Sequence, residues 1–313
     1  MTETNLGVRE LVVVQGFSDQ RIDNFLQREL KGVPRSYIYR ILRKGEVRVN
    51  KGRVKPVYRV QTGDIVRIPP VRITQTRSET PGQSLLKMLS DRILLEDEHL
   101  LVIDKPAGLA VHGGSGLRYG LIEGMRAIRP DCQALELVHR LDRATSGCIL
   151  IAKKRSILVE LHALLRDKHM TKTYWALIQG KWPKKKVGIN VPLQKNTLKS
   201  GERLVTVHRN GKASLTEFRM LRKGSTASLV EAKPVTGRTH QIRVHAQYAG
   251  HPIAGDDKYG EAAFDEQMKN QGLKRLFLHA HTIRFQLSVG AYAVTAPLDN
   301  ELQNVLTRLG LGQ

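Results

Sequence analysis

The sequence is poor in cysteine and in aromatic residues. It holds only two cysteines, Cys132 and Cys148, and aromatic residues make up 5% of its 313 positions. The two cysteines are not spaced as a short metal-ligand pair, and two thiols in a chain of this length do not form the framework of a small secreted domain. The sequence therefore argues against a zinc finger and a disulfide-stabilised fold, and it suits a reducing compartment.

Long apolar runs are also absent. Runs such as LVVV at 11–14 are far shorter than the roughly 20 residues that a membrane-spanning helix needs. The first ten residues, MTETNLGVRE, lack the basic start and apolar stretch of a secretory signal. Because 41% of the residues are hydrophobic, the chain has material for a sizeable core and length for two domains. We expect a folded cytoplasmic protein with no membrane partner.

Acidic residues are scarce relative to basic ones. Lysine and arginine total 51 against 29 aspartates and glutamates, which gives a net charge of +22. Residues 31–72 alone hold twelve basic and two acidic residues. Charge concentrated in this way indicates a polyanionic partner. Because no basic amphipathic helix with an aromatic face occurs there, nucleic acid is favoured over a lipid surface.

A first domain is expected over residues 20–72. Apolar residues recur at helical spacing in QRIDNFLQREL, and SYIYRILRKG indicates a second helix, with Ser36 as its N-cap and Gly45 at its end. EVRVN and GDIVRIP indicate strands, and NKGR indicates a turn. This order resembles the S4 domain, a small RNA-binding module.

The basic residues near the second helix are the predicted RNA contacts of this domain. A compact module that carries several cations near one helix end can bind RNA phosphates. The alternative is a solvated basic face without a ligand. The predicted contacts are Arg35, Arg40, Arg43, Lys44 and Arg48.

Residues 73–91 are predicted to be a linker, and residues 92–313 a second domain. The linker is rich in Thr, Ser, Gln, Pro and Gly. After it, strand-like runs such as LLVIDK and GCILIAK alternate with glycine-rich loops and a few helices. This pattern is typical of an α+β fold rather than of regular βαβ alternation.

Three familiar kinds of site fit the second domain poorly. Ser146 in ATSGC lacks the first glycine of a nucleophile elbow. VHGGSGLRYG lacks the lysine and hydroxyl residue of a phosphate-binding loop. His240, His245 and His251 are five and six positions apart, whereas metal ligands on one helix face need spacings of three or four. We therefore expect no metal site.

Asp142 is the carboxylate that remains as a candidate. It lies in VHRLDRATSG between Arg140 and Arg143, and the ten letters alone do not distinguish a structural ion pair from a working group. Glycoside hydrolysis needs two carboxylates, but no second acid is nearby. A reaction that breaks a glycosidic bond, keeps the base and reattaches it through another atom needs only one ionised carboxylate, and a nearby guanidinium favours that charged form.

Arg243 is the distant arginine that could reach this carboxylate. In PVTGRTHQIRVHAQYAG at 234–250, Thr239 can cap a helix that ends at Gly250. Arg243 lies near the first turn of that helix. The alternative for a single arginine is a surface residue without a functional partner.

Five ordered blocks of the second domain resemble the ribosomal large-subunit class of RNA pseudouridine synthases. They are DKPAGLAVHGGSG at 104–116, HRLDRATSG at 139–147, KTYWALIQG at 172–180, GRTHQIRVHAQYAGHPIAGDDKYG at 237–260 and RLFLHA at 275–280. The resemblance implies a catalytic domain with a mixed, largely antiparallel sheet. It also implies isomerisation of uridine to pseudouridine in 23S rRNA or a large-subunit assembly intermediate, with no cofactor. We expect a monomer.

The same resemblance assigns roles to individual residues. It makes Asp142 the nucleophile, attacking either the ribose or the base. Tyr174 packs against the target uracil and is a candidate to help remove the C5 proton. Arg243 pairs with Asp142, and Arg140 enters the space left by the flipped uridine. Arg143 receives no role beyond its charge.

Two positions depart from the pattern, and two alternatives stay open. Ala144 stands where many members have aspartate, and Asp104 where others have asparagine; neither has a proposed catalytic role. One alternative is the same chemistry on other rRNA uridines. The other is a ribosome assembly factor that binds RNA without catalysis.

Overall fold

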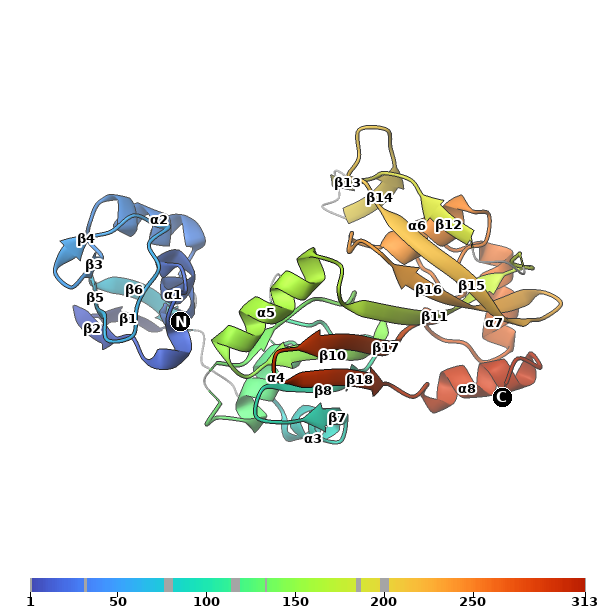
Figure 1. Cartoon of the computed structure of the whole chain (residues 1–313), viewed down its shortest axis with the longest axis horizontal. Coiled ribbons are helices and arrows are strands. Elements are labelled where there is room, and N and C mark those ends of the chain that lie inside the picture. Colours follow the sequence, from blue (N-terminus) through green and yellow to red (C-terminus); the bar gives the residue numbers. More distant parts are fainter. Residues whose placement is uncertain are drawn as a thin grey trace. The chain divides into compact units, whose positions relative to one another are not determined.

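The computed structural model describes residues 2–30, 33–75, 81–113, 119–132, 134–183, 187–197 and 203–312. The chain forms two compact units, of which the first holds Met1–Gly82 with Asp131–Ala134 and the second holds the rest (Figure 1). Within the described residues, no helix is long and apolar enough to cross a membrane.

The N-terminal unit packs two helices against a four-stranded antiparallel sheet of order β2-β5-β3-β4. Ile22, Phe25 and Leu26 are buried in its core, as their helical spacing predicts. Its elements are β1 (Thr2–Leu6), β2 (Arg9–Val12), the short 3-10 helix η1 (Gln15–Phe17), α1 (Ile22–Glu29), α2 (Arg35–Arg43), β3 (Arg48–Val49), β4 (Gly52–Arg53), β5 (Ile65–Ile68) and β6 (Val71–Gln75).

Helix α2 (Arg35–Arg43) begins two residues earlier than the sequence indicated. Pro34 occupies the N-cap position and no side chain caps the helix, so the prediction that Ser36 is the N-cap was wrong. The fixed φ of proline suits the entry to a helix. Gly45 follows the helix with φ +70°, as expected of a glycine that ends a helix. The turn predicted between β3 and β4 is confirmed.

The boundaries of the first unit also differ from the expected ones. The unit begins before residue 20, because β2 pairs with β5 and Val13 joins the core. The stretch 73–91 is not wholly a linker, because α3 (Gln83–Ser90) is the first element of the second unit. Leu89 of α3 is fully buried, a packing role that the polar composition around it concealed. Residues 76–80 lie outside the described residues.

The second unit is built on a mixed sheet of order β12-β15-β16-β11-β17-β10-β8-β7, with β18 paired to β17 and β9 to β10. Among the described strands of this sheet, only the β10–β17 pair is parallel, so the predicted α+β fold with a largely antiparallel sheet is confirmed. The strands are β7 (Ile93–Glu96), β8 (Leu100–Lys105), β9 (Glu136–Leu137), β10 (Ser146–Ala152), β11 (Thr171–Gln179), β12 (Val187–Asn190), β15 (Leu215–Lys223), β16 (Ala227–Pro234), β17 (Leu278–Leu287) and β18 (Gly290–Thr295).

Helices cover this sheet through two hydrophobic clusters. One joins α5 to β8, β10 and β17, and the other joins α7 and α8 to β11 and β16 (Figure 1). A separate hairpin of β13 (Leu193–Thr197) and β14 (Arg203–Val207) contacts α6. The helices are α4 (Leu121–Ile128), α5 (Arg155–Arg166), α6 (Gln241–Tyr248), α7 (Ala262–Asn270) and α8 (Asn300–Arg308).

The register of the central strands brings two predicted site segments together. Ala280 of β17 pairs with Gly147 of β10 on one side and with Tyr174 of β11 on the other. The loop that carries Asp142 directly precedes β10, so it enters the sheet next to Tyr174. Gly147 has φ +106°, and a Cβ there would overlap the Ala280 backbone, so this approach requires glycine.

Candidate active site

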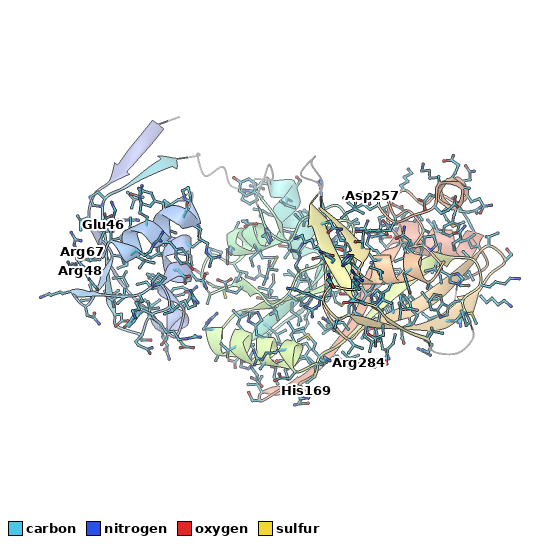
Figure 2. The ribbon with its side chains drawn as sticks, turned by 90° about the horizontal axis from the view of Figure 1, so that it is seen from above. Glu46, Arg48, Arg67, His169, Asp257 and Arg284 are labelled. Carbon is cyan, nitrogen blue, oxygen red and sulfur yellow. The ribbon has the colours of Figure 1, made fainter. Side chains whose placement is uncertain are left out.

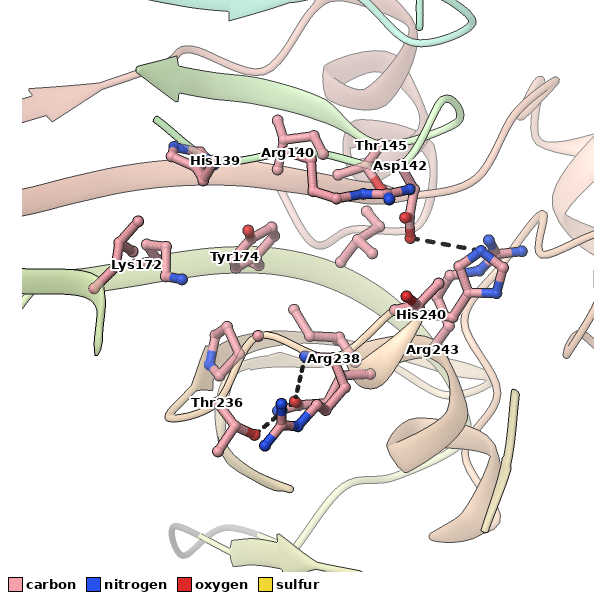
Figure 3. A pocket seen from close by; sticks show the side chains of 18 residues that line it. His139, Arg140, Asp142, Thr145, Lys172, Tyr174, Thr236, Arg238, His240 and Arg243 are labelled. Atoms are coloured by element: carbon pink, nitrogen blue, oxygen red, sulfur yellow. Dashed lines mark hydrogen bonds and ion pairs between the residues drawn. The ribbon is translucent and has the colours of Figure 1, made fainter. Parts of the chain in front are cut away.

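A cavity of about 330 Å³ lies between the loop before β10, strand β11 and the start of α6 (Figure 3). Its size falls within the roughly 300–1,000 Å³ usual for small-molecule sites. Four residues that the sequence singled out line it together: Asp142, Tyr174, Arg243 and Arg140.

The Asp142 loop is a tight turn held by backbone hydrogen bonds. The Thr145 amide donates to the Asp142 carbonyl at 3.1 Å. Arg143 fixes the loop to a neighbouring one, since its Nε donates to the Gly108 carbonyl at 2.8 Å and its carbonyl accepts from the Gly108 amide at 2.8 Å. The structure therefore gives Arg143 a positioning role that the sequence did not reveal. The Asp142 side chain is 20% exposed.

Lys105, which the sequence did not single out, is hydrogen-bonded to the backbone of the same loop. Its fully buried ammonium group donates to the carbonyls of Pro106 and Leu109 at 2.9 Å and of Arg143 at 3.2 Å. Burial lowers the pKa of Lys105 to about 7, although the charge of Asp142 opposes this shift. The preceding residue, Asp104, is buried and pairs with Arg92 at 3.1 Å.

Tyr174 forms part of the cavity wall on β11, at a point where the register with β17 shifts. Its side chain is almost fully buried. Burial raises the pKa of its phenol, and the nearby charge of Asp142 raises it further. Tyr174 is therefore a neutral phenol around pH 7 rather than a phenolate, so it is poorly suited to take up a proton.

Arg243 does not form the ion pair that was expected. Its Nε and Nη2 contact the two carboxylate oxygens of Asp256 at 2.7 and 2.5 Å, and Nη2 also contacts Asp257 at 2.9 Å. Burial alone lowers the pKa of Arg243, but Asp256, Asp142 and Asp257 together raise it above its ordinary value. The prediction of a direct pair with Asp142 was wrong, because Asp256 is a nearer partner that sequence distance did not reveal.

The loop before α6 is fixed by a buried glutamine. The side-chain oxygen of Gln241 accepts from the Thr236 hydroxyl at 2.6 Å and the Arg238 amide at 3.1 Å. Its side-chain nitrogen donates to Leu215 of β15 at 2.9 Å. The sequence predicted that Thr239 caps the helix, and this prediction was wrong. The N-cap position belongs to His240, which makes no side-chain cap hydrogen bond.

Among the described residues, the His240 ring approaches the Asp142 carboxylate. Its Nε2 lies 3.9 Å from the Asp142 Oδ2 (Figure 3). Its Nδ1 lies 2.8 Å from the Tyr259 hydroxyl. His245 and His251 instead contact Ser214 at 3.0 Å and the Gln179 carbonyl at 2.8 Å. The three histidines therefore have separate partners, and no group of metal-ligating side chains is found among the described residues.

Cations surround the rest of the cavity. Arg140 is exposed, whereas Lys172 of β11 is half-buried. Burial lowers the pKa of Lys172. Arg238 is exposed on the opposite wall. These groups suit a polyanionic substrate whose reacting part enters the cavity while its phosphates stay outside.

The five predicted RNA contacts lie in the N-terminal unit and all except Arg48, which is half-buried, are exposed. Three come from α2: Arg35 lies 3.6 Å from Asp23, Arg40 stacks over the Tyr37 ring at 4.4 Å, and Arg43 donates to the Tyr39 carbonyl at 3.3 Å. Lys44 lies 3.8 Å from Glu46, and Arg48 donates to the Lys51 carbonyl at 3.2 Å.

Known proteins are similar to this chain in fold and in sequence. The family model for RNA pseudouridylate synthase matches residues 99–248, and the S4 domain model matches residues 20–66. The human RNA pseudouridylate synthase domain containing 4 structure superposes with a TM-score of 0.61 at 25% identity, over 72% of this chain and 96% of its own. The human domain containing 1 structure gives 0.60 at 27% identity, over 72% and 89%.

The fold and the site thus define an RNA pseudouridine synthase, an isomerase, that carries an S4 domain. Full-length relatives support this. Ribosomal large subunit pseudouridine synthase C of Pasteurella multocida is 55% identical over 97% of this chain and 95% of its own. The protein of the same name from Escherichia coli (strain K12) is 54% identical over 98% of each. The chain belongs to this family of pseudouridine synthases.

Proposed function

We propose that this protein converts several uridines of 23S rRNA to pseudouridine, using Asp142 as its nucleophile. The relatives that match along nearly the whole chain are named for the large ribosomal subunit. The observation that carries the proposal is the convergence of Asp142 and Tyr174 on one cavity bordered by arginines. Large-subunit rRNA or an assembly intermediate is the partner, in the cytoplasm, and the enzyme acts as a monomer without a cofactor.

The reaction is an isomerisation whose atoms balance within the nucleotide. The bond between N1 and C1′ breaks, a bond between C5 and C1′ forms, C5 loses its proton and N1 gains one. Asp142 forms a transient covalent bond either with C1′ or with the base, and it is released when the new bond forms. One carboxylate is enough because no water has to be activated.

Access to C1′ and C5 requires the uridine to leave the RNA stack. Extrusion of a base costs a few kcal/mol. Arg140 is exposed at the cavity wall, and its planar guanidinium can stack where the base was and also contact a phosphate. Tyr174 then packs against the extruded uracil. Because the phenol of Tyr174 is neutral, its ring rather than its ionisation accounts for this role.

The N-terminal unit supplies affinity for RNA. In addition to the cations of α2, its sheet carries a row of arginines, because Arg48 pairs with Arg53 on one side and Arg67 on the other. Figure 2 labels Arg48 and Arg67 of this row. Like charges directly opposite each other destabilise a sheet, and an anionic ligand that lies across them removes this penalty. RNA phosphates are such a ligand.

The target is tested by mapping carbodiimide-reactive pseudouridines in rRNA from a strain that lacks the protein. We expect several 23S positions to lose the modification and to regain it when the wild-type gene is restored. If other rRNA positions lose their pseudouridine instead, the proposed reaction stands and the proposed target is wrong. A complete, unchanged set of pseudouridines would favour the binding-only assembly factor.

A further inference from the structure

The Tyr259 hydroxyl has a defined hydrogen-bond pattern. It accepts a hydrogen bond from the backbone amide of Val205 on β14 at 2.9 Å and lies 2.8 Å from Nδ1 of His240. The tyrosine is 2% exposed, so water does not replace a protein partner. Among the described residues, His240 Nδ1 is the acceptor available to its single proton. The Tyr259 hydroxyl therefore donates to His240 Nδ1.

This hydrogen bond determines the tautomer of His240. When Nδ1 accepts a hydrogen bond, a neutral imidazole carries its proton on Nε2. Nε2 is the nitrogen that faces Asp142, at 3.9 Å from Oδ2. Burial lowers the pKa of His240, while the charge of Asp142 opposes that shift. The neutral ring therefore presents an N–H group, and not a lone pair, to the carboxylate.

The backbone of His240 has an uncommon conformation. Its φ is +52°, a left-handed conformation that residues with a side chain seldom adopt and that asparagine tolerates best. The adjacent Gln241 fixes the loop to β15. Arg243, whose charge also interacts with Asp142, is bound by Asp256 and Asp257. Within the described part of the chain, His240 is thus the side chain that contacts Asp142 without being held by another carboxylate.

We propose that His240 is a positioning residue for Asp142, held as the Nε2–H tautomer by Tyr259. Its Nε2–H donates to the carboxylate and aims the other oxygen at the nucleotide. The present separation of 3.9 Å is too long for a hydrogen bond, and such contacts commonly tighten when substrate binds. This inference rests on the proposed role of Asp142.

The kinetic test uses a pair of substitutions in the full-length protein. His240→Gln places an amide N–H near the position of Nε2, whereas His240→Asn places it near that of Nδ1 and suits the left-handed backbone better. We expect His240→Asn to lower kcat about ten- to a hundredfold, as for loss of a hydrogen bond to a charged group, with KM for 23S rRNA unchanged. His240→Gln should recover most of this loss.

A second variant and a spectroscopic measurement separate positioning from folding. Tyr259→Phe should lower kcat about tenfold or more without changing RNA affinity. In ¹⁵N-histidine spectra of the full chain, the His240 ring should be the Nε2–H tautomer, and Tyr259→Phe should add the Nδ1–H form. His169→Gln, at an exposed site that does not line the cavity, is the control; it removes its own ring signals but should change neither the kinetics nor the His240 signals.

Asp142→Asn, assayed beside these variants by tritium release from 23S rRNA that contains 5-tritiated uridine, distinguishes the positioning role from the proposed mechanism. If Asp142→Asn is inactive while His240→Asn and Tyr259→Phe match the wild type, the positioning role is wrong and the nucleophile stands. If Asp142→Asn is active, the proposed mechanism itself fails. An Nδ1–H tautomer in the wild-type spectrum would also overturn the inference.

Discussion

Arg243 forms a two-point ion pair with Asp256, and both side chains are almost completely buried. This pair attaches the first turn of α6 to the loop that follows the helix. Because Arg243 also lines the cavity, its charge contributes to the environment of Asp142 while its position is fixed by another carboxylate. The helix N-terminus adds a favourable partial charge.

Removing one member of this ion pair should lower the free energy of unfolding. Asp256→Asn leaves the Arg243 guanidinium buried without its main counter-charge, and we expect a loss of about 3–5 kcal/mol in the free energy of unfolding. Chemical denaturation measures this change. Asp257→Asn is the matched control, because Asp257 is 75% exposed, and it should cost under about 1 kcal/mol. Equal effects for the two variants would contradict this account of the site.

The pKa shift of Lys105 predicts a pH dependence of stability. Its pKa falls from 10.5 to about 7 on folding, so between these values the unfolded chain binds more protons than the folded chain. The free energy of unfolding should therefore rise from pH 7 to pH 10 relative to Lys105→Met. Parallel denaturation series for the two proteins measure the difference. A difference that stays constant with pH is incompatible with the buried, shifted ammonium group.

Tyr174 should act through its ring. Because the phenol pKa is raised by burial and by Asp142, kcat should show no step attributable to phenol ionisation between pH 6 and 9. Tyr174→Phe should bind RNA with wild-type affinity, and Tyr174→Leu should lose more activity than Tyr174→Phe. Full pH–rate profiles of the three proteins provide the measurement. A wild-type rate that rises with phenol ionisation would show that Tyr174 works as a phenolate base.

The arginine row of the N-terminal unit should determine the salt dependence of RNA binding. If Arg48 and Arg67 each contact a phosphate, replacing both with alanine lowers the slope of log affinity against log salt by about 1.4–1.8, from roughly 0.7–0.9 per contact. The double variant Lys55→Ala, Arg59→Ala removes the same charge elsewhere in the unit and should change the slope less. Identical slopes for the two double variants would exclude a specific role for the row.

The sequence was sufficient to find four residues of the cavity but not their partners. Asp142 and Tyr174 stand in recognisable blocks, and the strand and helix patterns predicted the α+β fold. Arg243 was assigned to Asp142 because a sequence motif does not state which of several carboxylates is nearest. Asp256, thirteen positions later, is brought to it only by the turn after α6.

Buried polar groups were the other features that the sequence could not reveal. Lys105 precedes a proline and a glycine-rich loop, where a lysine is usually exposed, yet it is buried against backbone carbonyls. His240 was considered only as a metal ligand, and its contact with Tyr259 depends on tertiary structure. Helix α3 was hidden because polar neighbours outweighed three leucines at helical spacing. The burial of Lys105 and the contact of His240 depend on long-range contacts that local periodicity does not encode.

We expect Asp142 to be the nucleophile of a uridine isomerase, and the experiment that tests this role is tritium release from 23S rRNA that contains 5-tritiated uridine. The full-length wild-type protein should release tritium as the C5 proton is lost. Asp142→Asn should bind the same RNA with nearly unchanged affinity and release none above background. Release by Asp142→Asn at a rate close to that of the wild type would contradict the account.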